Sequence, residues 1–400
     1  MVTLADIQAA RRRIGDHVFY SPCARSEILS RMTGCELYLK LENLQMTGSF
    51  KERGALNKIL ALSEVQKAAG VIAASAGNHA QGVAHAARLS GIRAVIVMPE
   101  TAPLAKVRGV RELGAEIVLY GSGYDDAFGK ARELQQSHGY TFVHAFDDPE
   151  VIAGQGTIGL ELLEQIPELE VVVAPVGGGG LIAGIATAVK TLRPQVRVIG
   201  VETALLPAMQ ASLMAGRIQP LPAASTLADG ISVAVVGQHT FPIVSCYVEA
   251  IVTVTEEEIA KAIMIILDRE KTLAEGAGAV GFAALLNSKI PDVHGRKTVV
   301  VLSGGNIDMT LLSRIIERGL ESDGRLARLK VVIPDKPGSI ADLSAIIAER
   351  RANIFQISQS RPLSDVQLGQ TEVELVLETR GWDHVQEIVA AIEAIGLSVK

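Results

Sequence analysis

Short aliphatic runs alternate with amphipathic helical stretches between residues 70 and 120. Residues 70–74, 94–98 and 116–120 are rich in Val, Ile and Ala, which is typical of strands buried on both faces. Residues 78–90 and 106–113 have the apolar spacing of helices. This strand–helix order predicts a parallel sheet with right-handed crossovers.

A second group of apolar runs begins near residue 170. It predicts strands at residues 170–176, 196–201 and 298–302, with a helix at 181–192 after the first of them. The fold class is therefore α/β, with two open parallel sheets and a cleft between them. Ligands of such sheets bind at the carboxyl ends of the strands.

The C-terminal part has a different pattern. Polar and charged residues at 321–328 indicate a linker. Beyond it, the pattern predicts strands at 329–333, 353–359, 371–378 and 397–400, and helices at 339–350 and 382–395. This βαββαβ order is typical of a small ferredoxin-like domain.

A chain of 400 residues is too long for one hydrophobic core. We expect a first domain at residues 1–320, with a small subdomain at about 48–145 inserted in the larger one. The linker and a second domain at residues 329–400 complete the chain.

Composition excludes several classes of protein. The net charge is −6, without a long block of one sign, so neither a nucleic-acid partner nor an anionic membrane surface is expected. The apolar run 171–189 contains a proline and four successive glycines, which a membrane-spanning helix would hardly tolerate. Cys23, Cys35 and Cys246 are odd in number and far apart, so we expect neither disulfides nor a metal site. A cytoplasmic protein fits this composition.

One lysine stands among small and apolar residues. Lys51 follows Gly48, Ser49 and Phe50 at a turn between ordered segments. An amine nucleophile must be held away from bulk water, and Phe50 offers an apolar wall beside it. Taken alone, the same pattern also suits an ordinary surface lysine.

A glycine-rich loop lies between a predicted strand and a predicted helix, and it consists of Gly177, Gly178, Gly179, Gly180 and Leu181. Its backbone N–H groups lie at the positive end of a helix dipole, which suits a phosphate. The spacing is that of neither a Walker loop nor GxGxxG. The alternative is a flexible turn, although four glycines cost backbone entropy.

A second helix start carries Ser75, Gly77, Asn78 and His79. It could hold a carboxylate, or Ser75 and Asn78 could merely cap the helix. His79 suits packing or hydrogen bonding better than catalysis. At a third turn, Ser303 could cap a helix or bind a ligand, and the spacing does not decide.

A lysine, a phosphate loop and a carboxylate loop in one cleft point to pyridoxal phosphate acting on an α-amino acid. At these residues the chain resembles the fold type II (tryptophan synthase β-like) pyridoxal-phosphate enzymes, and within them the threonine ammonia-lyases (threonine dehydratases). The matching segments are residues 47–51, 75–82, 175–181, 226–230 and 303–306, which span most of residues 1–320.

The resemblance implies a role for each site residue. Lys51 would bind pyridoxal 5'-phosphate as a Schiff base and remove the Cα proton, with Phe50 beside the cofactor. Asn78 would contact its 3-hydroxyl and Ser303 its pyridine nitrogen. The phosphate would bind to Gly177, Gly178, Gly179, Gly180 and Leu181, and the substrate carboxylate to Ser75, Gly77, Asn78 and His79.

The implied reaction is β-elimination of L-threonine, and also of L-serine, to 2-oxobutanoate or pyruvate and ammonia. A serine racemase of the same fold is one alternative. Racemases carry a second serine where Ala76 stands, and bind a divalent metal through acidic residues after the strand of Glu202. Here Leu206 and Ala208 follow Glu202, so elimination is favoured. The other alternative is an amino-acid-binding regulator without turnover.

The C-terminal domain resembles ACT domains, which bind amino-acid effectors. The resemblance implies that Gly338, Ser339 and Asn353 contact an effector such as isoleucine or valine, as in isoleucine biosynthesis. A domain that serves only assembly is the alternative. We expect a homo-oligomer, a dimer or a tetramer.

Overall fold

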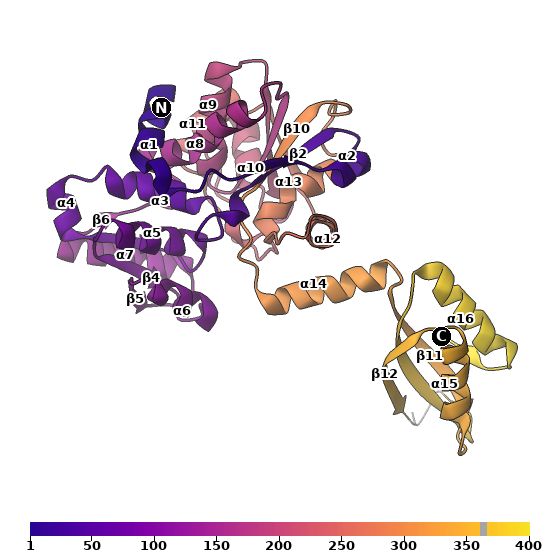
Figure 1. Cartoon of the computed structure of the whole chain (residues 1–400). Helices are drawn as coiled ribbons and strands as arrows, with labels where there is room; N and C mark the ends of the chain where they lie inside the picture. The colour runs from indigo at the N-terminus through magenta and orange to yellow at the C-terminus, as the bar shows by residue number, and fades with distance from the viewer. Residues whose placement is uncertain (361–365) are drawn as a thin grey trace. The chain divides into compact units, whose positions relative to one another are not determined.

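The computed structural model describes residues 1–360 and 366–400, and these form two compact units (Figure 1). Unit 1 is Met1–Ile307 and unit 2 is Asp308–Lys400. Unit 1 contains two parallel α/β sheets, so the predicted fold class is confirmed.

The smaller sheet of unit 1 is entirely parallel, with strand order β5-β4-β3-β6. Its strands are β3 Val71–Ala74, β4 Ala94–Met98, β5 Glu116–Leu119 and β6 Thr141–Phe142. Its helices are α4 Glu64–Ala69, α5 Asn78–Leu89, α6 Leu104–Glu112 and α7 Tyr124–His138. The three strands and two helices predicted between residues 70 and 120 are all present. The apolar runs of β3 and β4 are buried, whereas β5 lies at the edge of the sheet and its Leu119 is 45% exposed.

The larger sheet has the order β1-β2-β10-β7-β8-β9, and only β1 is antiparallel to its neighbour. Its strands are β1 Cys23–Arg25, β2 Glu36–Leu41, β7 Val171–Pro175, β8 Arg197–Thr203, β9 Ala250–Val254 and β10 Lys297–Leu302. Strands β7, β8 and β10 are the predicted ones. Strand β2 is not among the predicted strands, because the charged Lys40 interrupts its apolar pattern and yet is fully buried.

The remaining helices of unit 1 pack around the larger sheet and join it to the smaller one. They are α1 Leu4–Ile14, α2 Glu27–Thr33, α3 Lys51–Leu60, α8 Pro149–Gln165, α9 Gly180–Leu192, α10 Ala208–Ala215, α11 Thr240–Tyr247, α12 Glu256–Ile265 and α13 Gly276–Leu286. Glycines let α3, α8 and α9 approach closely. A Cβ on Gly154 of α8 would lie 2.7 Å from the carbonyl oxygen of Arg53 in α3, and one on Gly184 of α9 would lie 2.4 Å from that of Ile152 in α8.

A buried ionic network fixes the start of α3. The guanidinium of Arg53 donates to both oxygens of Glu42, each at 2.8 Å, and to Glu161 at 2.6 and 3.0 Å. The ammonium of Lys40 donates to Glu161 at 2.5 Å and to the carbonyl oxygen of Ser21 at 2.7 Å. Burial alone would raise the pKa of Glu42, but the adjacent Arg53 holds it below its usual value. Since Arg53 is two residues from Lys51, this network anchors the helix that carries the candidate nucleophile.

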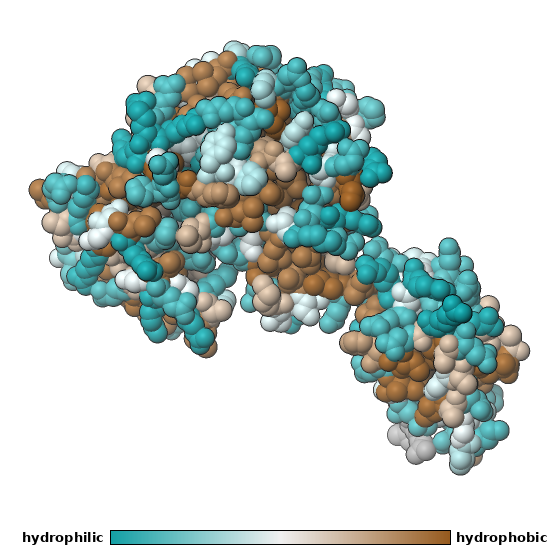
Figure 2. All heavy atoms as spheres, in the orientation of Figure 1, coloured by the Kyte–Doolittle hydropathy of each residue, from teal (hydrophilic) through white to brown (hydrophobic). Residues whose placement is uncertain are grey.

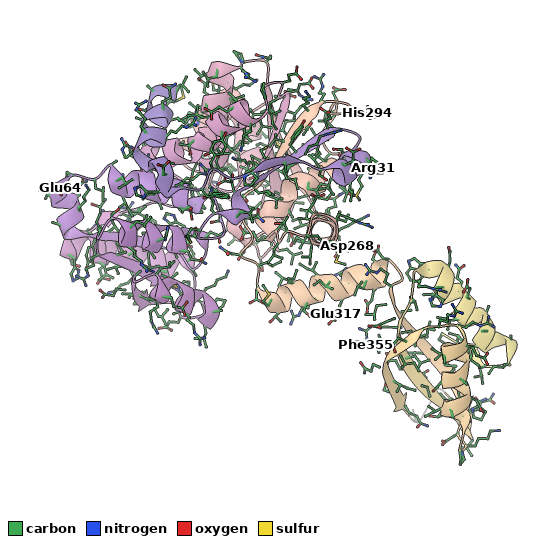
Figure 3. The ribbon with its side chains drawn as sticks, in the orientation of Figure 1. Arg31, Glu64, Asp268, His294, Glu317 and Phe355 are labelled. Carbon is green, nitrogen blue, oxygen red and sulfur yellow. The ribbon has the colours of Figure 1, made fainter. Side chains whose placement is uncertain are left out.

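Unit 2 has the predicted βαββαβ order and an antiparallel sheet of order β12-β13-β11-β14, preceded by one further helix. Its elements are α14 Met309–Ser322, β11 Leu326–Pro334, α15 Ser339–Glu349, β12 Asn353–Ser360, β13 Gln370–Glu378, α16 Trp382–Ala394 and β14 Ser398–Val399. The topology is ferredoxin-like. In Figure 3, Phe355 is labelled on β12, where it is the extra residue of a β-bulge and is 67% exposed.

The connection between α14 and β11 is shorter than the predicted linker at 321–328. Helix α14 continues to Ser322, and β11 already begins at Leu326 because Leu326 and Ala327 are buried. The indole N–H of Trp382 donates to the carbonyl oxygen of Ser322 at 3.0 Å, which ties the end of α14 to α16.

Among the described residues, no helix combines the length and apolar character needed to cross a bilayer. Figure 2 shows hydrophilic side chains over much of one face of both units, with hydrophobic residues between them.

Candidate active site

Lys51 is the first residue of α3 and directly follows Phe50, which occupies the N-cap position. Its ammonium nitrogen Nζ donates to the carbonyl oxygen of Ala145 at 2.9 Å and lies 5.1 Å from the centre of the Phe50 ring. Burial lowers the pKa of Lys51 to about 8, although the negative charge of Glu275 opposes this shift. An amine with this pKa is far more easily deprotonated at neutral pH than a solvated lysine.

The backbone around Lys51 is paired with the end of β10. The N–H of Phe50 donates to the carbonyl oxygen of Ser303 at 3.0 Å, and the N–H of Gly305 donates to that of Gly48 at 2.9 Å. Gly48 has φ +72°, and a Cβ there would lie 2.4 Å from Oδ1 of Asn306. Glycine is therefore required at this turn for both its conformation and its contact with Asn306.

The glycine loop 177–180 connects β7 to α9, as predicted, and Gly179 has φ +94°. The loop carries glycines because other backbone and side chains press against it. A Cβ on Gly178 would lie 2.3 Å from the ring of Phe146, and one on Gly180 would lie 2.8 Å from the Phe146 carbonyl oxygen. A Cβ on Gly177 would lie 2.9 Å from Ile231.

The amide groups of this loop provide a direct test of whether a phosphate fits. The N–H groups of Gly177 through Leu181 have no acceptor within the part of the chain that the structure describes, although most of these residues are buried. Buried backbone N–H groups are nearly always paired. A row of free amides at the start of a 13-residue helix matches the oxygens and charge of a phosphate. The loop therefore fits the phosphate of the cofactor that the resemblance implies.

The start of α5 offers a second set of free amides. Gly77 precedes the helix, which has no side-chain cap; instead the hydroxyl oxygen of Ser75 accepts from the N–H of Gly77 at 3.1 Å. The amides of Asn78 and His79 have no acceptor among the residues described. These groups could bind a carboxylate. The side chains of Ser75 and Asn78 therefore do not cap α5, contrary to the alternative interpretation of this sequence.

The side chain of His79 is buried and faces away from this chemistry. Its Nε2 donates to the carbonyl oxygen of Val143 at 2.8 Å, with the proton on Nε2 because a carbonyl can only accept. Burial, together with the charge of Lys51, lowers the pKa of His79 to about 3, so the ring is neutral. His79 can reach a substrate only through its backbone amide.

Ser303 follows β10 and is 2% exposed. It does not cap a helix, because the N-cap of α14 is Asp308, whose side chain accepts from Thr310 and Leu311. Its carbonyl oxygen accepts from Phe50, while its hydroxyl has no hydrogen bond to the described residues. The hydroxyl therefore remains available to a ligand at the carboxyl end of the strand.

Residues that sequence reasoning missed complete the site. Ala145 and Phe146 lie in the connection from β6 to α8, and they contact Lys51 and the glycine loop. Glu275 accepts from the side-chain amide of Asn78 at 2.7 Å, and Asn306 donates to the Asn78 oxygen at 2.8 Å. The one available signal for Glu275 is that it is the only charged residue between positions 272 and 286.

Glu202 is also buried, but it serves the fold. Its two carboxylate oxygens accept from the backbone N–H groups of Met209 and Gln210, both at 2.8 Å, at the start of α10. Burial raises the pKa of Glu202 to about 7. In the described ranges 1–360 and 366–400, no group of three His, Cys, Asp or Glu residues is arranged to hold a metal.

We expect that a comparison of wild type with Glu202→Gln will show how the titration of Glu202 changes the free energy of unfolding with pH. The pKa of Glu202 near 7 in the folded state exceeds its value of 4.5 when unfolded, so the folded state binds this proton more tightly. That stabilisation is complete below about pH 4.5 and is lost as the pH rises through about 7. The free energy of unfolding of wild type relative to the variant should fall by on the order of 3 kcal/mol between about pH 5 and about pH 8.

Urea unfolding of the cofactor-free proteins measures this difference. His79 and Glu275 titrate equally in both proteins, so they cancel. A difference that is flat or grows with pH would contradict the assignment.

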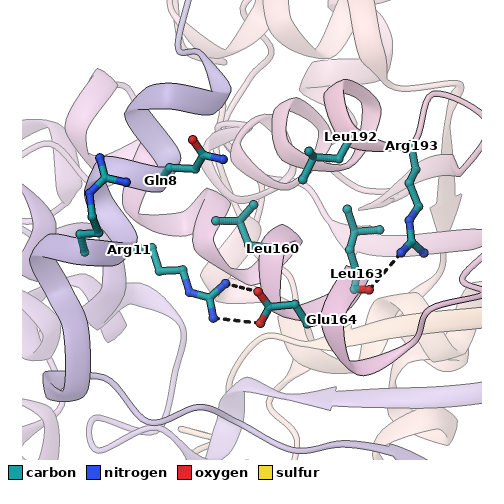
Figure 4. A pocket seen from close by; sticks show the side chains of 8 residues that line it. Gln8, Arg11, Leu160, Leu163, Glu164, Leu192 and Arg193 are labelled. Atoms are coloured by element: carbon teal, nitrogen blue, oxygen red, sulfur yellow. Dashed lines mark hydrogen bonds and ion pairs between the residues drawn. The ribbon is translucent and has the colours of Figure 1, made fainter.

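A separate concavity between α1, α8 and α9 contains none of the candidate active-site residues (Figure 4). It contains the ion pair between Arg11 and Glu164, and Arg193, which donates to the carbonyl oxygen of Leu163. No lysine lines it.

The predicted effector residues lie in unit 2, in two different settings. Gly338 has φ +97° and precedes α15, and the buried hydroxyl of Ser339 has no hydrogen-bond partner among the residues that the structure describes. The side chain of Asn353 donates instead to Glu378 of the neighbouring strand at 2.8 Å. Of these two settings, the start of α15 has a polar group without a partner among the described residues.

Comparisons with known proteins agree with this geometry. The family model for pyridoxal-phosphate dependent enzymes matches residues 14–305. An L-threonine ammonia-lyase of Thermotoga maritima is 50% identical over 400 residues, covering 100% of this chain and 99% of that protein. The processed form of threonine deaminase isoform 2 from Solanum lycopersicum has a TM-score of 0.76 at 41% identity, covering 78% of this chain and 91% of the other. Serine racemase from Dictyostelium discoideum has a TM-score of 0.73 at 36% identity, covering 77% and 99%.

Proposed function

Because this chain belongs to the family of pyridoxal-phosphate dependent enzymes, we propose that it is an L-threonine ammonia-lyase. It eliminates the β-hydroxyl of L-threonine, and of L-serine, to give 2-oxobutanoate or pyruvate and ammonia. The observation that carries this proposal is the 50% identity to such an enzyme along the whole chain, with Lys51 held as a part-buried amine of lowered pKa.

The residues of the site divide the work of binding. Lys51 would hold the cofactor covalently through Nζ, with the ring of Phe50 beside it. The amides of the loop 177–181 would hold its phosphate, and the hydroxyl of Ser303 would hydrogen-bond its pyridine nitrogen. When bound, the cofactor supplies an electron sink for the Cα carbanion.

The remaining groups act on the substrate. The amides at the start of α5 and the hydroxyl of Ser75 would hold the carboxylate and so orient the Cα–H bond. Nζ of Lys51 would take the Cα proton, which its lowered pKa near 8 allows at neutral pH. A neutral serine at the ring nitrogen donates or accepts without adding charge, which favours loss of the β-substituent over a persistent carbanion.

A ketoacid assay tests the proposed reaction. We expect 2-oxobutanoate from L-threonine and pyruvate from L-serine. The two substrates should differ in kcat/KM by no more than about 200-fold, because one methyl group in a pocket contributes only about 1–3 kcal/mol. Protein that carries the cofactor but forms neither ketoacid would contradict the proposal and favour an amino-acid-binding regulator.

Racemisation is the second candidate, since a serine racemase shares the fold. Residue 76 is Ala76, which packs against the core of the smaller sheet and offers no acid to the opposite face of Cα. Both oxygens of Glu202 accept from backbone N–H groups at the start of α10. We therefore expect no D-serine from L-serine, as chiral chromatography would measure.

We also propose that unit 2 is an ACT-type domain that binds a branched-chain amino acid near Gly338 and Ser339. What supports this is the ferredoxin-like topology and the buried Ser339 hydroxyl, which has no partner in the described part of unit 2. Isothermal titration with L-isoleucine and L-valine should give saturable heat. Ser339→Ala should weaken binding about threefold to tenfold, the effect of one lost hydrogen bond.

If titration of the wild type with these amino acids gives no heat, regulation at this site is contradicted and assembly is left as the role of unit 2. The homo-oligomer remains a prediction, which sedimentation analysis would measure.

A further inference from the structure

One buried acidic side chain beside the site has no role in the reaction described above. Glu275 is 4% exposed and stands at the N-cap position of α13, but its carboxyl makes no capping hydrogen bond. No ion pair to it is found within the described parts of the chain. A buried carboxyl without a cation is costly, so its place requires an explanation.

The carboxyl of Glu275 contacts Asn78 directly. Nδ2 of Asn78 donates to Oε1 of Glu275 at 2.7 Å, and Nδ2 of Asn306 donates to Oδ1 of Asn78 at 2.8 Å. Asn306 in turn is fixed by donating to the carbonyl oxygen of Thr47 at 2.8 Å. The amide of Asn78 is thus held by an acceptor on one side and a donor on the other.

This arrangement determines which way round the Asn78 amide lies. A flipped amide would place an oxygen against the carboxylate of Glu275 and a nitrogen against the N–H of Asn306, and both contacts would be repulsive. Nδ2 carries two hydrogens, and Glu275 accepts only one of them. The second makes no hydrogen bond to the described residues and is free to donate.

We propose that Glu275 is a positioning residue that orients Asn78, so that the second Nδ2 hydrogen is presented to the ring oxygen of the cofactor. The inference rests on the proposed function, in which Asn78 contacts that oxygen. Its physical basis is the hydrogen bond of the carboxyl rather than its charge, because Asn78 is neutral.

The main chain of Glu275 is anchored separately from its side chain. Its N–H donates to the carbonyl oxygen of Gly304 at 3.0 Å. A Cβ on Gly304 would lie 2.5 Å from Oε1 of Glu275, so the carboxyl is confined against the Gly304 backbone. Substitutions of the side chain should therefore leave the start of α13 in place.

Two conservative variants separate the hydrogen bond from the charge. Glu275→Gln keeps an acceptor oxygen at the same reach and removes the charge. Glu275→Asp keeps the charge but is shorter by one methylene, about 1.5 Å, and cannot reach Asn78. The readouts are the dissociation constant of pyridoxal 5'-phosphate from the apoprotein and the wavelength of the visible absorbance band of the bound cofactor.

We expect the dissociation constant to stay within about threefold of wild type for Glu275→Gln and to rise about tenfold for Glu275→Asp. The absorbance band should shift more in the aspartate variant than in the glutamine variant, which keeps the hydrogen bond to Asn78 and loses only the negative charge that acts on Lys51. The opposite order, or equal values for both variants, would overturn the proposal.

A double-mutant cycle with Asn78→Ala provides an independent check. If Glu275 acts through Asn78, the pair Glu275→Asp and Asn78→Ala should weaken binding no more than Asn78→Ala alone. Additive losses would overturn the proposal. The wild type is measured beside the variants. If it binds the cofactor and forms 2-oxobutanoate, the proposed function stands even where the variants contradict the role of Glu275, so the two failures are distinguishable.

Discussion

Replacing Lys51 with alanine is expected to abolish both the visible absorbance of the bound cofactor and the formation of 2-oxobutanoate. The variant loses the amine that holds the cofactor and takes the Cα proton, so kcat should fall by at least about 10⁴-fold. Spectra of the purified protein and a ketoacid assay measure the two effects. Borohydride reduction followed by peptide mapping should label Lys51 in the wild type.

Lys67 provides the matched control for this variant. It lies on α4 and pairs with Glu64, which is labelled in Figure 3, through an exposed ion pair of 2.8 Å. Lys67→Ala should leave the absorbance and the rate unchanged. Normal turnover in Lys51→Ala, or a borohydride label on another lysine, would refute the assignment of the nucleophile.

Replacing Arg53 with leucine is expected to destabilise unit 1 by about 3–5 kcal/mol. The variant leaves the carboxylate of Glu42 buried without a cation, because Lys40 contacts only Glu161 of the two carboxylates. Leaving such a charge unpaired costs far more than the ion pair contributes. Urea unfolding of the full chain measures the loss.

Two further variants test this explanation. Arg53→Leu combined with Glu42→Gln removes the stranded charge and should regain part of the lost stability. Arg93→Gln breaks an ion pair with Glu116 whose side chains are 59% and 53% exposed, so it should cost less than about 1 kcal/mol. Equal losses for Arg53→Leu and Arg93→Gln would show that burial does not set the cost.

The parts of the fold that depend on local sequence were predictable. The apolar runs at β3, β4 and β7 are buried on both faces, and such runs are readable without a structure. The glycine loop and the helix starts with free amides were also predictable, because they are local features of the sequence and their backbone N–H groups need no distant partner. The pattern itself pointed to a phosphate and a carboxylate as ligands, whereas the role of each single residue came from the resemblance.

The rest of the site depends on contacts between distant segments. Lys40 and Arg53 are charged residues that are fully buried because Glu42 and Glu161 together neutralise them, and Glu161 lies more than a hundred positions away from both. Glu275 reaches Asn78 across 197 positions. The glycines of the phosphate loop were attributed to phosphate binding by backbone amides, but Phe146 also leaves no room for a side chain at two of them, Gly178 and Gly180. Single-sequence patterns carry no record of such pairings.

The position of Trp382 makes unit 2 observable by itself. It is the only tryptophan in the chain, and its indole lies against Ser322 at the end of α14. Intrinsic fluorescence excited at the indole band therefore reports on the C-terminal unit, while the colour of a lysine-bound cofactor would report on the other. One sample, followed with two optical channels, can reveal whether the two halves melt together or one after the other.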